Sequence, residues 1–107
     1  MIVVANRIYV NPDHAAAFEE AFSKRAALVD GMPGFVAFQL LRPTGDDQPY
    51  TVMTFWETMD AFHAWTQSES FKQGHARSGS LPADTFTRPT ELEISEVITS
   101  TARIERA

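Results

Sequence analysis

The chain contains no cysteine, and this absence excludes several classes of site. Without thiols it can form neither disulfide bonds nor cysteine-bound zinc or iron–sulfur sites, and it cannot use a cysteine nucleophile. Basic residues are also scarce, because nine Lys and Arg stand against fourteen Asp and Glu, for a net charge of −5. Nucleic-acid backbones are bound by clustered Lys and Arg, so we expect no nucleic-acid partner.

Long apolar segments are missing as well. No run approaches the roughly 20 apolar residues that a membrane-spanning helix needs, so we expect no membrane partner. A strand-like pattern begins at the N-terminus, which leaves no room for a signal peptide. We therefore expect a soluble, cytoplasmic protein. Its 107 residues are enough for a single domain, spanning residues 1–107, with its own core.

The first notable feature that is present is Asn6, a carboxamide within an apolar strand face. Apolar residues alternate along the start of the chain, so Asn6 shares its face with Ile2, Val4, Ile8 and Val10. A buried polar group without hydrogen-bond partners costs roughly 1–3 kcal/mol. Asn6 is therefore either a core group with partners inside the fold or a donor directed into a pocket.

The apolar periodicity of the whole chain predicts a ferredoxin-like α+β fold. In order, it predicts a strand over 1–10, a helix over 13–30, strands over 35–42 and 50–57, short helices starting at Thr58 and Ser68, and a strand over 91–103. Residues 76–89 predict a long mobile loop, of the kind that is disordered or acts as a lid. Leu92 and Ile94 are out of phase with Val97, which predicts a bulge. The β-α-β-β-α-β order is that of a four-stranded antiparallel sheet with helices on one face.

The first three strands carry apolar residues on both faces, although two helices can cover only one face. A large open apolar face is not tolerated in a soluble monomer. We therefore expect the second face to meet the sheet of another copy of the chain. The expected assembly is a homodimer in which two sheets form an α+β barrel.

His75 is the candidate metal ligand, because a neutral imidazole can bind iron. It follows Phe71 by four residues and shares its face if the helix continues that far. The alternative is a partly exposed histidine at a helix end. For His14 and His63, a structural or surface role is the better interpretation.

Arg25 and Trp65 are each open to two interpretations. Arg25 interrupts the apolar stripe between Phe22 and Val29, where it could bind a carboxylate ligand or pair with an acidic side chain. Trp65 follows Phe62 by three residues, so we expect one of the two to face the core and the other to lie at its edge. The sequence has no Ser-His-Asp order, glycine-rich phosphate loop or paired-carboxylate motif.

Several segments together share their residues with one enzyme family. They are Asn6, Pro33-Gly34-Phe35, FQLLRP at 38–43, TFWE at 54–57, Ala61-Phe62, Ala64-Trp65, Phe71-Lys72 and His75. On these segments the chain resembles the IsdG-type haem-degrading monooxygenases of the antibiotic biosynthesis monooxygenase superfamily. The similarity is close over residues 1–77, and residues 34–43 are especially similar to the mycobacterial member. The Asn-Trp-His set is its specific part.

The resemblance implies a dimeric α+β barrel with a haem cleft between the helices and the sheet of each subunit. It implies that His75 is the axial ligand of the haem iron and that Asn6 donates a hydrogen bond to oxygen on the other side. Trp65 would press on the porphyrin and ruffle it. Further implied contacts are Phe22, Phe62 and Phe71 as apolar lining and Arg25 for a propionate.

The implied reaction uses haem as both substrate and cofactor. The enzyme, an oxidoreductase, would use O2 and electrons from an external reductant or reductase to open the ring to a bilin-type tetrapyrrole, with release of iron. Two alternatives stay open. A cofactor-free superfamily member that oxidises a phenolic polyketide to a quinone would use Asn and Trp but not His75. A non-catalytic haem-binding protein would hold haem without degrading it.

Overall fold

The computed structural model describes residues 1–78 and 81–101, and it describes His75, Arg77 and Ser78 by their backbone alone. The predicted β-α-β-β-α-β order is confirmed. The strands are β1 (Ile2–Ile8), β2 (Phe35–Leu41), β3 (Tyr50–Trp56) and β4 (Glu91–Glu96). The helices are α1 (Ala15–Ser23), α2 (Arg25–Val29), α3 (Met59–Thr66) and α4 (Glu69–Ser78), with 3-10 turns η1 (Pro12–His14) and η2 (Ala83–Thr85).

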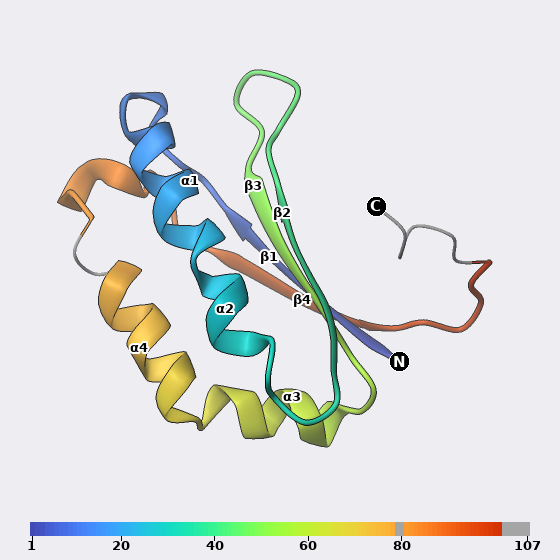
Figure 1. The fold of residues 1–107 in the computed structure, drawn as a ribbon. Helices are drawn as coiled ribbons and strands as arrows, with labels where there is room; N and C mark the ends of the chain where they lie inside the picture. The colour runs from blue at the N-terminus through green and yellow to red at the C-terminus, as the bar shows by residue number, and fades with distance from the viewer. Residues whose placement is uncertain (79–80, 102–107) are drawn as a thin grey trace.

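The strands form one four-stranded antiparallel sheet in the order β2-β3-β1-β4. The helices lie on one side of this sheet (Figure 1). This arrangement is the ferredoxin-like α+β fold that the sequence predicts. Within residues 1–78 and 81–101, no helix combines the length and the apolar character that crossing a lipid bilayer requires.

The helix predicted over 13–30 is divided into η1, α1 and α2, with a break at Lys24. Its first turn is capped by Asn11, two residues before the predicted start of the helix at residue 13. The Asn11 side chain accepts a hydrogen bond from the Asp13 backbone N–H at 3.0 Å. The predicted core-facing stripe is confirmed, because Phe18, Phe22 and Val29 are buried.

Hydroxyl caps start the two later helices at the predicted residues. Thr58 Oγ1 accepts a hydrogen bond from the Ala61 backbone N–H at 3.1 Å, and Ser68 Oγ accepts one from the Phe71 N–H at 3.1 Å. Each cap satisfies an N–H group that has no partner within its helix. The Thr58 and Ser68 caps therefore determine where the helices that carry Trp65 and His75 begin.

The core beneath the helices consists of two buried clusters. One contains Ile8, Phe18, Phe22, Tyr50 and Val52, and the other contains Ile2, Val4, Val29 and Trp56. The alternating face of β1 contributes to both, with Val4 in one cluster and Ile8 in the other. Asn6 lies between them on the same face, so the carboxamide is placed where the two clusters separate.

The prediction for the last strand was wrong in length and in shape. β4 ends at Glu96, and the residues described after it form no further strand; residues 102 and 103 lie outside the described part. The β1–β4 pairing runs from Ile2↔Glu96 to Arg7↔Glu91 with no register shift, so the predicted bulge is absent from it. A shift occurs on β2 instead, between Phe35 and Ala37.

The predicted mobile loop over 76–89 is largely ordered by backbone contacts. α4 continues to Ser78, and η2 packs on the connection between β1 and α1. Thr85 is fully buried, and its carbonyl accepts a hydrogen bond from the Asn11 N–H at 2.8 Å. The Thr87 N–H donates to the Tyr9 carbonyl at 3.0 Å. Residues 79 and 80 of this loop lie outside the described part.

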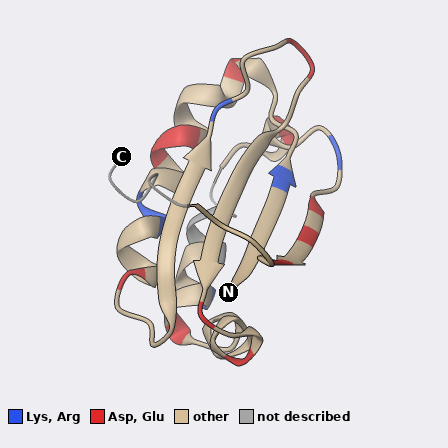
Figure 2. Ribbon diagram, turned by 90° about the vertical axis from the view of Figure 1, so that its right-hand side faces the viewer, with Lys and Arg blue, Asp and Glu red and all other residues tan. Residues whose placement is uncertain are grey.

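The opposite face of the sheet is divided between apolar and charged side chains. Strand register places Val3 beside Phe55 and Ala5 beside Met53 on this face, as the sequence predicts. Toward β4 the face is charged, where Arg7 pairs with Glu93 at 2.9 Å. Figure 2, which looks onto this face, shows Lys and Arg at scattered positions among the elements.

Candidate functional site

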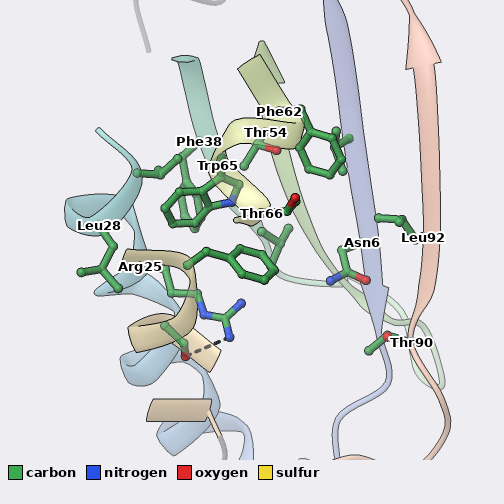
Figure 3. Close-up of a pocket in the computed structure, with 15 residues that line it drawn as sticks. Asn6, Arg25, Leu28, Phe38, Thr54, Phe62, Trp65, Thr66, Thr90 and Leu92 are labelled. Atoms are coloured by element: carbon green, nitrogen blue, oxygen red, sulfur yellow. Dashed lines mark hydrogen bonds between the residues drawn. The ribbon is translucent and has the colours of Figure 1, made fainter. Parts of the chain in front are cut away.

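A cavity of about 290 Å³ opens between the helices and the sheet. Its lining residues come from every strand and from α2, α3 and α4 (Figure 3). It lies between the two core clusters, since Val4 of one and Val52 of the other both line it. The cavity therefore forms at the break in the core that Asn6 marks.

Asn6 lines the cavity, and its side chain points into it (Figure 3). Among the described residues, its carboxamide makes no hydrogen bond with another protein group. Of the two interpretations open on the sequence, the structure therefore supports a donor directed into a pocket. The strand beneath it is held on both sides, because Asn6 is opposite Val52 on β3 and Leu92 on β4.

Trp65 forms part of the cavity wall and is held by other aromatic rings. Its indole stacks on that of Trp56, with centroids 6.3 Å apart and an angle of 28°, and meets the edge of Phe71 at 5.4 Å. Trp56 is fully buried, and its Nε1 donates a hydrogen bond to Thr54 Oγ1 at 2.9 Å. Contacts on two sides leave the Trp65 ring little freedom to rotate.

Phe62 also lines the cavity and is half-buried, like Trp65. The expectation that one of the pair faces the core while the other lies at its edge was therefore wrong. Residues three apart on a helix share a face, and α3 turns this face to both the core and the cavity. Both side chains pack against the cluster that contains Trp56.

Arg25 brings a positive charge to the cavity from the start of α2. Its guanidinium lies 4.1 Å above the ring of Phe22, and its Nη2 donates a hydrogen bond to the Gly74 carbonyl on α4 at 3.1 Å (Figure 3). Burial lowers the pKa of Arg25 to about 10, so the side chain stays charged near neutral pH. Phe22 itself lies in the core behind Arg25 and does not line the cavity.

Phe71 and Gly74 bring one face of α4 to the cavity. His75 follows Gly74, and its backbone is helical, as expected, while its side chain lies outside the described part. Because His75 follows Phe71 by one helical turn, the two positions lie on overlapping faces of α4. Among the described residues, no three His, Asp or Glu side chains gather as they would around a bare metal ion.

The other two histidines lie elsewhere, as expected. His14 Nε2 lies 2.8 Å from Asp84 Oδ1, where it joins η1 to η2. His63 is on the exposed side of α3. Neither lines the cavity.

Sequence reasoning missed several residues of the cavity, among them Thr54, Thr66, Thr90 and Leu92. Two of these share the sheet face of Asn6, because Thr54 is opposite Val4 and Leu92 is opposite Asn6. Alternation within each strand could have placed them on a face. Only the register between strands places them beside Asn6.

The cavity's fit to haem can be tested on these residues. Aromatic rings and aliphatic side chains suit a flat macrocycle, and a guanidinium suits a propionate carboxylate. An imidazole from a single helix is one way in which haem iron is held, and it requires no cluster of ligands. The residues present therefore fit the group.

Comparison with known proteins gives close relatives. The chain is 36% identical over 93 residues to the heme oxygenase (mycobilin-producing) of Mycobacterium tuberculosis, with 87% of this chain and 88% of that protein covered. The structure of the heme-degrader MhuD from Mycobacterium tuberculosis, with two hemes bound in its active site, matches with a TM-score of 0.75. That match is 32% identical and covers 95% of this chain and all of MhuD (100%).

A relative with another chemistry has the same fold. SnoaB, a cofactor-independent oxygenase from Streptomyces nogalater, matches with a TM-score of 0.76 at 26% identity, over 94% of this chain and 95% of SnoaB. Residues 1–77 match the family described as antibiotic biosynthesis monooxygenase. This match runs from β1 into α4 and includes the helices that wall the cavity. The chain therefore belongs to the antibiotic biosynthesis monooxygenase family.

Proposed function

We propose that this protein is a haem-degrading monooxygenase, an oxidoreductase that opens the haem ring to a bilin-type tetrapyrrole and releases iron. The observation that carries the proposal is Asn6, whose carboxamide has no protein hydrogen bond among the described residues and points into a cavity walled by Trp65. Relatives that are 36% and 32% identical to this chain support haem as the substrate.

Haem is held in this proposal by groups from three elements. His75 on α4 would hold the haem iron, Arg25 on α2 would bind a propionate, and Asn6 on β1 would direct its carboxamide at the bound group. Phe62 and Phe71 provide apolar contact. Phe22 supports Arg25 from the core instead of contacting haem, since it does not line the cavity. When bound, haem supplies the iron centre at which O2 is activated.

Asn6 and Trp65 act on the bound substrate by virtue of their fixed positions. The Asn6 Nδ2–H group can donate a hydrogen bond where negative charge develops on oxygen. Because β1 is paired on both sides, this donor needs little reorganisation, which is the condition under which such a donor is most effective. Trp65 is held in the cavity wall by Trp56 and Phe71, so its indole would pack against the bound macrocycle and would resist being displaced by it.

The proposal includes partners that the chain itself does not supply. O2 and electrons must come from outside, the electrons from a small reductant or a reductase. We also propose that residues 1–107 form a single domain, that the protein acts in the cytoplasm, and that it is a homodimer. The apolar part of the sheet face opposite the helices supports the homodimer.

Two other functions compete with haem degradation. The match to SnoaB favours the cofactor-free oxidation of a phenolic compound. Its TM-score of 0.76 is practically the same as the TM-score of 0.75 for MhuD. Fold similarity thus cannot separate the two, whereas identities of 32% and 26% favour haem degradation. A protein that binds haem without degrading it needs the same cavity.

An absorbance titration with haemin tests the proposal, followed by ascorbate and a hydrogen-peroxide scavenger in air. We expect a saturable Soret band that decays while a bilin-like band appears. A Soret band that persists with ascorbate and with an enzymatic reductase would favour haem storage. Without saturable binding, the cofactor-free reaction would become the better hypothesis.

Substitution of His75 tests its role as the iron ligand, and His63 on the neighbouring helix α3 provides the matched control. His75→Ala should change the Soret position and the spin state of bound haemin. His63→Ala, which removes an exposed histidine of α3, should change neither. An unaltered spectrum in His75→Ala would mean that another group is the ligand.

A further inference from the structure

Leu92 is a large apolar side chain left open to solvent beside the cavity. It is 60% exposed, although it lies on the sheet face that the helices cover elsewhere. Ile94 follows on the same face of β4 and is 40% exposed. Among the described residues β4 pairs with β1 alone and forms the edge of the sheet, and the exposure of Leu92 and Ile94 shows that the helices leave these side chains largely uncovered.

Strand register places Leu92 directly opposite Asn6. Both residues line the cavity, and Figure 3 shows Leu92 on β4 next to the carboxamide of Asn6 on β1. The aromatic wall that contains Trp65 comes from the helices on the other side of the cavity. A flat molecule that contacts Asn6 would therefore have the aromatic wall on one side and β4 beside it.

The size of the cavity indicates in which direction a substrate extends. Its volume of about 290 Å³ is at the lower end of the range of roughly 300–1,000 Å³ that is usual for ligand pockets. A tetrapyrrole with its side groups is larger than the enclosed space. On the helix side the cavity is closed by core residues such as Val29, which is 1% exposed. The exposed lining residues are Thr90, directly before β4, and Leu92 on β4, so the cavity is open toward β4.

We infer that Leu92 is a substrate-contacting residue, and that the bound macrocycle extends out of the cavity across the face of β4 and covers Leu92. This inference rests on the proposed function, because it takes haem as the occupant. It assigns to the edge strand a part of substrate binding that is absent from the Asn-Trp-His set.

Replacement of Leu92 by threonine tests the inference, because threonine favours strands and removes most of the apolar contact. We expect Leu92→Thr to weaken haemin binding by about tenfold, the loss expected for an apolar side chain that is no longer covered. The melting temperature without haemin should stay unchanged, since the side chain is exposed, and haemin should raise it less than in the wild type. Leu92→Met, which keeps an apolar side chain of similar volume, should retain the affinity.

Ile98→Thr is the matched control, because Ile98 is 88% exposed and does not line the cavity. It should bind haemin as the wild type does. If Leu92→Thr also binds like the wild type, the inference is overturned while the proposed function stands. A lower melting temperature of haem-free Leu92→Thr would make Leu92 a structural residue and would also overturn it. If the wild type shows no saturable binding, the proposed function fails, and the inference with it.

Discussion

At the scale of single residues, Asn6 gives the site its chemical character. Its neighbours on the strand face, Val4 and Ile8, are buried in separate core clusters. An aliphatic residue at position 6 could join the clusters, but it would leave no donor in the cavity. The Asn6 carboxamide is half-buried and faces the cavity, so a ligand bound there could accept its hydrogen bond in place of solvent.

Substitution of Asn6 by alanine is expected to separate binding from turnover. Asn6→Ala should retain saturable haemin binding but lose about 10²-fold or more of the degradation rate, which is typical for removal of one stabilising donor. Initial rates of Soret decay with ascorbate measure the effect. Gln67→Ala, which truncates an exposed carboxamide after α3, is the control and should keep the wild-type rate. An Asn6→Ala protein with full turnover would exclude Asn6 from the mechanism.

At the scale of elements, the position of α3 depends on a close approach to the turn before β2. Gly34 has φ of +78°, and a Cβ atom built on it would lie 2.5 Å from Ala61 Cβ. Glycine is the residue that adopts this conformation without strain, and here it also leaves room for the helix. Because α3 carries Phe62 and Trp65, this contact determines how far the aromatic wall lies from the sheet.

Gly34→Ala should therefore destabilise the fold. Backbone strain and overpacking each cost about 1–3 kcal/mol, so we expect a loss of roughly 2–6 kcal/mol in the free energy of unfolding, measured by urea denaturation. Gly31→Ala is the matched control, since a Cβ atom at that position meets nothing within 4 Å. A similar midpoint for both variants would contradict the importance of this contact.

A second contact between elements ties α1 to the hairpin of β2 and β3. Glu19 on α1 accepts hydrogen bonds from Arg42 Nε at 2.8 Å, from Arg42 Nη2 at 2.6 Å and from the Tyr50 hydroxyl at 2.5 Å. The hydrogen bonds from Arg42, and then that from Tyr50, lower the pKa of Glu19 from its ordinary value of 4.5 to about 2. The charged form of Glu19 is therefore favoured in the folded state.

The stabilisation from Glu19 should depend on pH with a definite sign. A depressed folded-state pKa contributes stability that is complete above the unfolded value and is lost as the pH falls through the folded value. Wild type should thus melt at a higher temperature than Glu19→Gln above pH 4.5, and the difference should shrink as the pH falls from 4.5 to about 2. Glu20→Gln, which alters only an exposed pair with Lys24 at 3.3 Å, should change the melting temperature little. A difference that does not depend on pH would contradict this role of Glu19.

At the scale of the whole molecule, the two faces of the sheet differ in what covers them. The helices cover one face and enclose the cavity on it, whereas the other face carries apolar side chains over β1 to β3 and charged ones toward β4. Burial of the apolar part by a second copy would leave the charged part at the edge of the interface. This pattern agrees with an apolar interface core and a polar rim.

Light scattering measures the expected assembly directly. At micromolar concentration we expect a mass of about twice the 12.0 kDa of one chain, because an apolar face that the helices leave uncovered is costly in a monomer. Met53→Glu would place a charge on the apolar part of the face and should shift the mass toward that of one chain. A wild-type mass near 12.0 kDa at the same concentration would count against the homodimer.

The sequence by itself determined the features that depend on near neighbours along the chain. Alternation in β1 placed Asn6 with Val4 and Ile8 on one face, and the hydroxyls of Thr58 and Ser68 marked the starts of α3 and α4. These features follow from backbone geometry and from hydrogen bonds within one turn, so a short stretch of sequence contains all their causes. The order of the elements, and with it the fold, follows from the same local signals.

The tertiary structure decided everything that depends on contacts between distant segments. Pairing of β4 with β1 ends at Glu96 and places Leu92 beside Asn6, and backbone hydrogen bonds from Asn11 and Tyr9 order the segment around Thr85. Residues 81–89 have the composition of a mobile loop. Their order could not be predicted from that composition, because it comes from partners that are far away in sequence. The cavity itself is also a product of packing, since α2, α3 and α4 bring Arg25, Trp65 and Gly74 to one space only when they dock on the sheet.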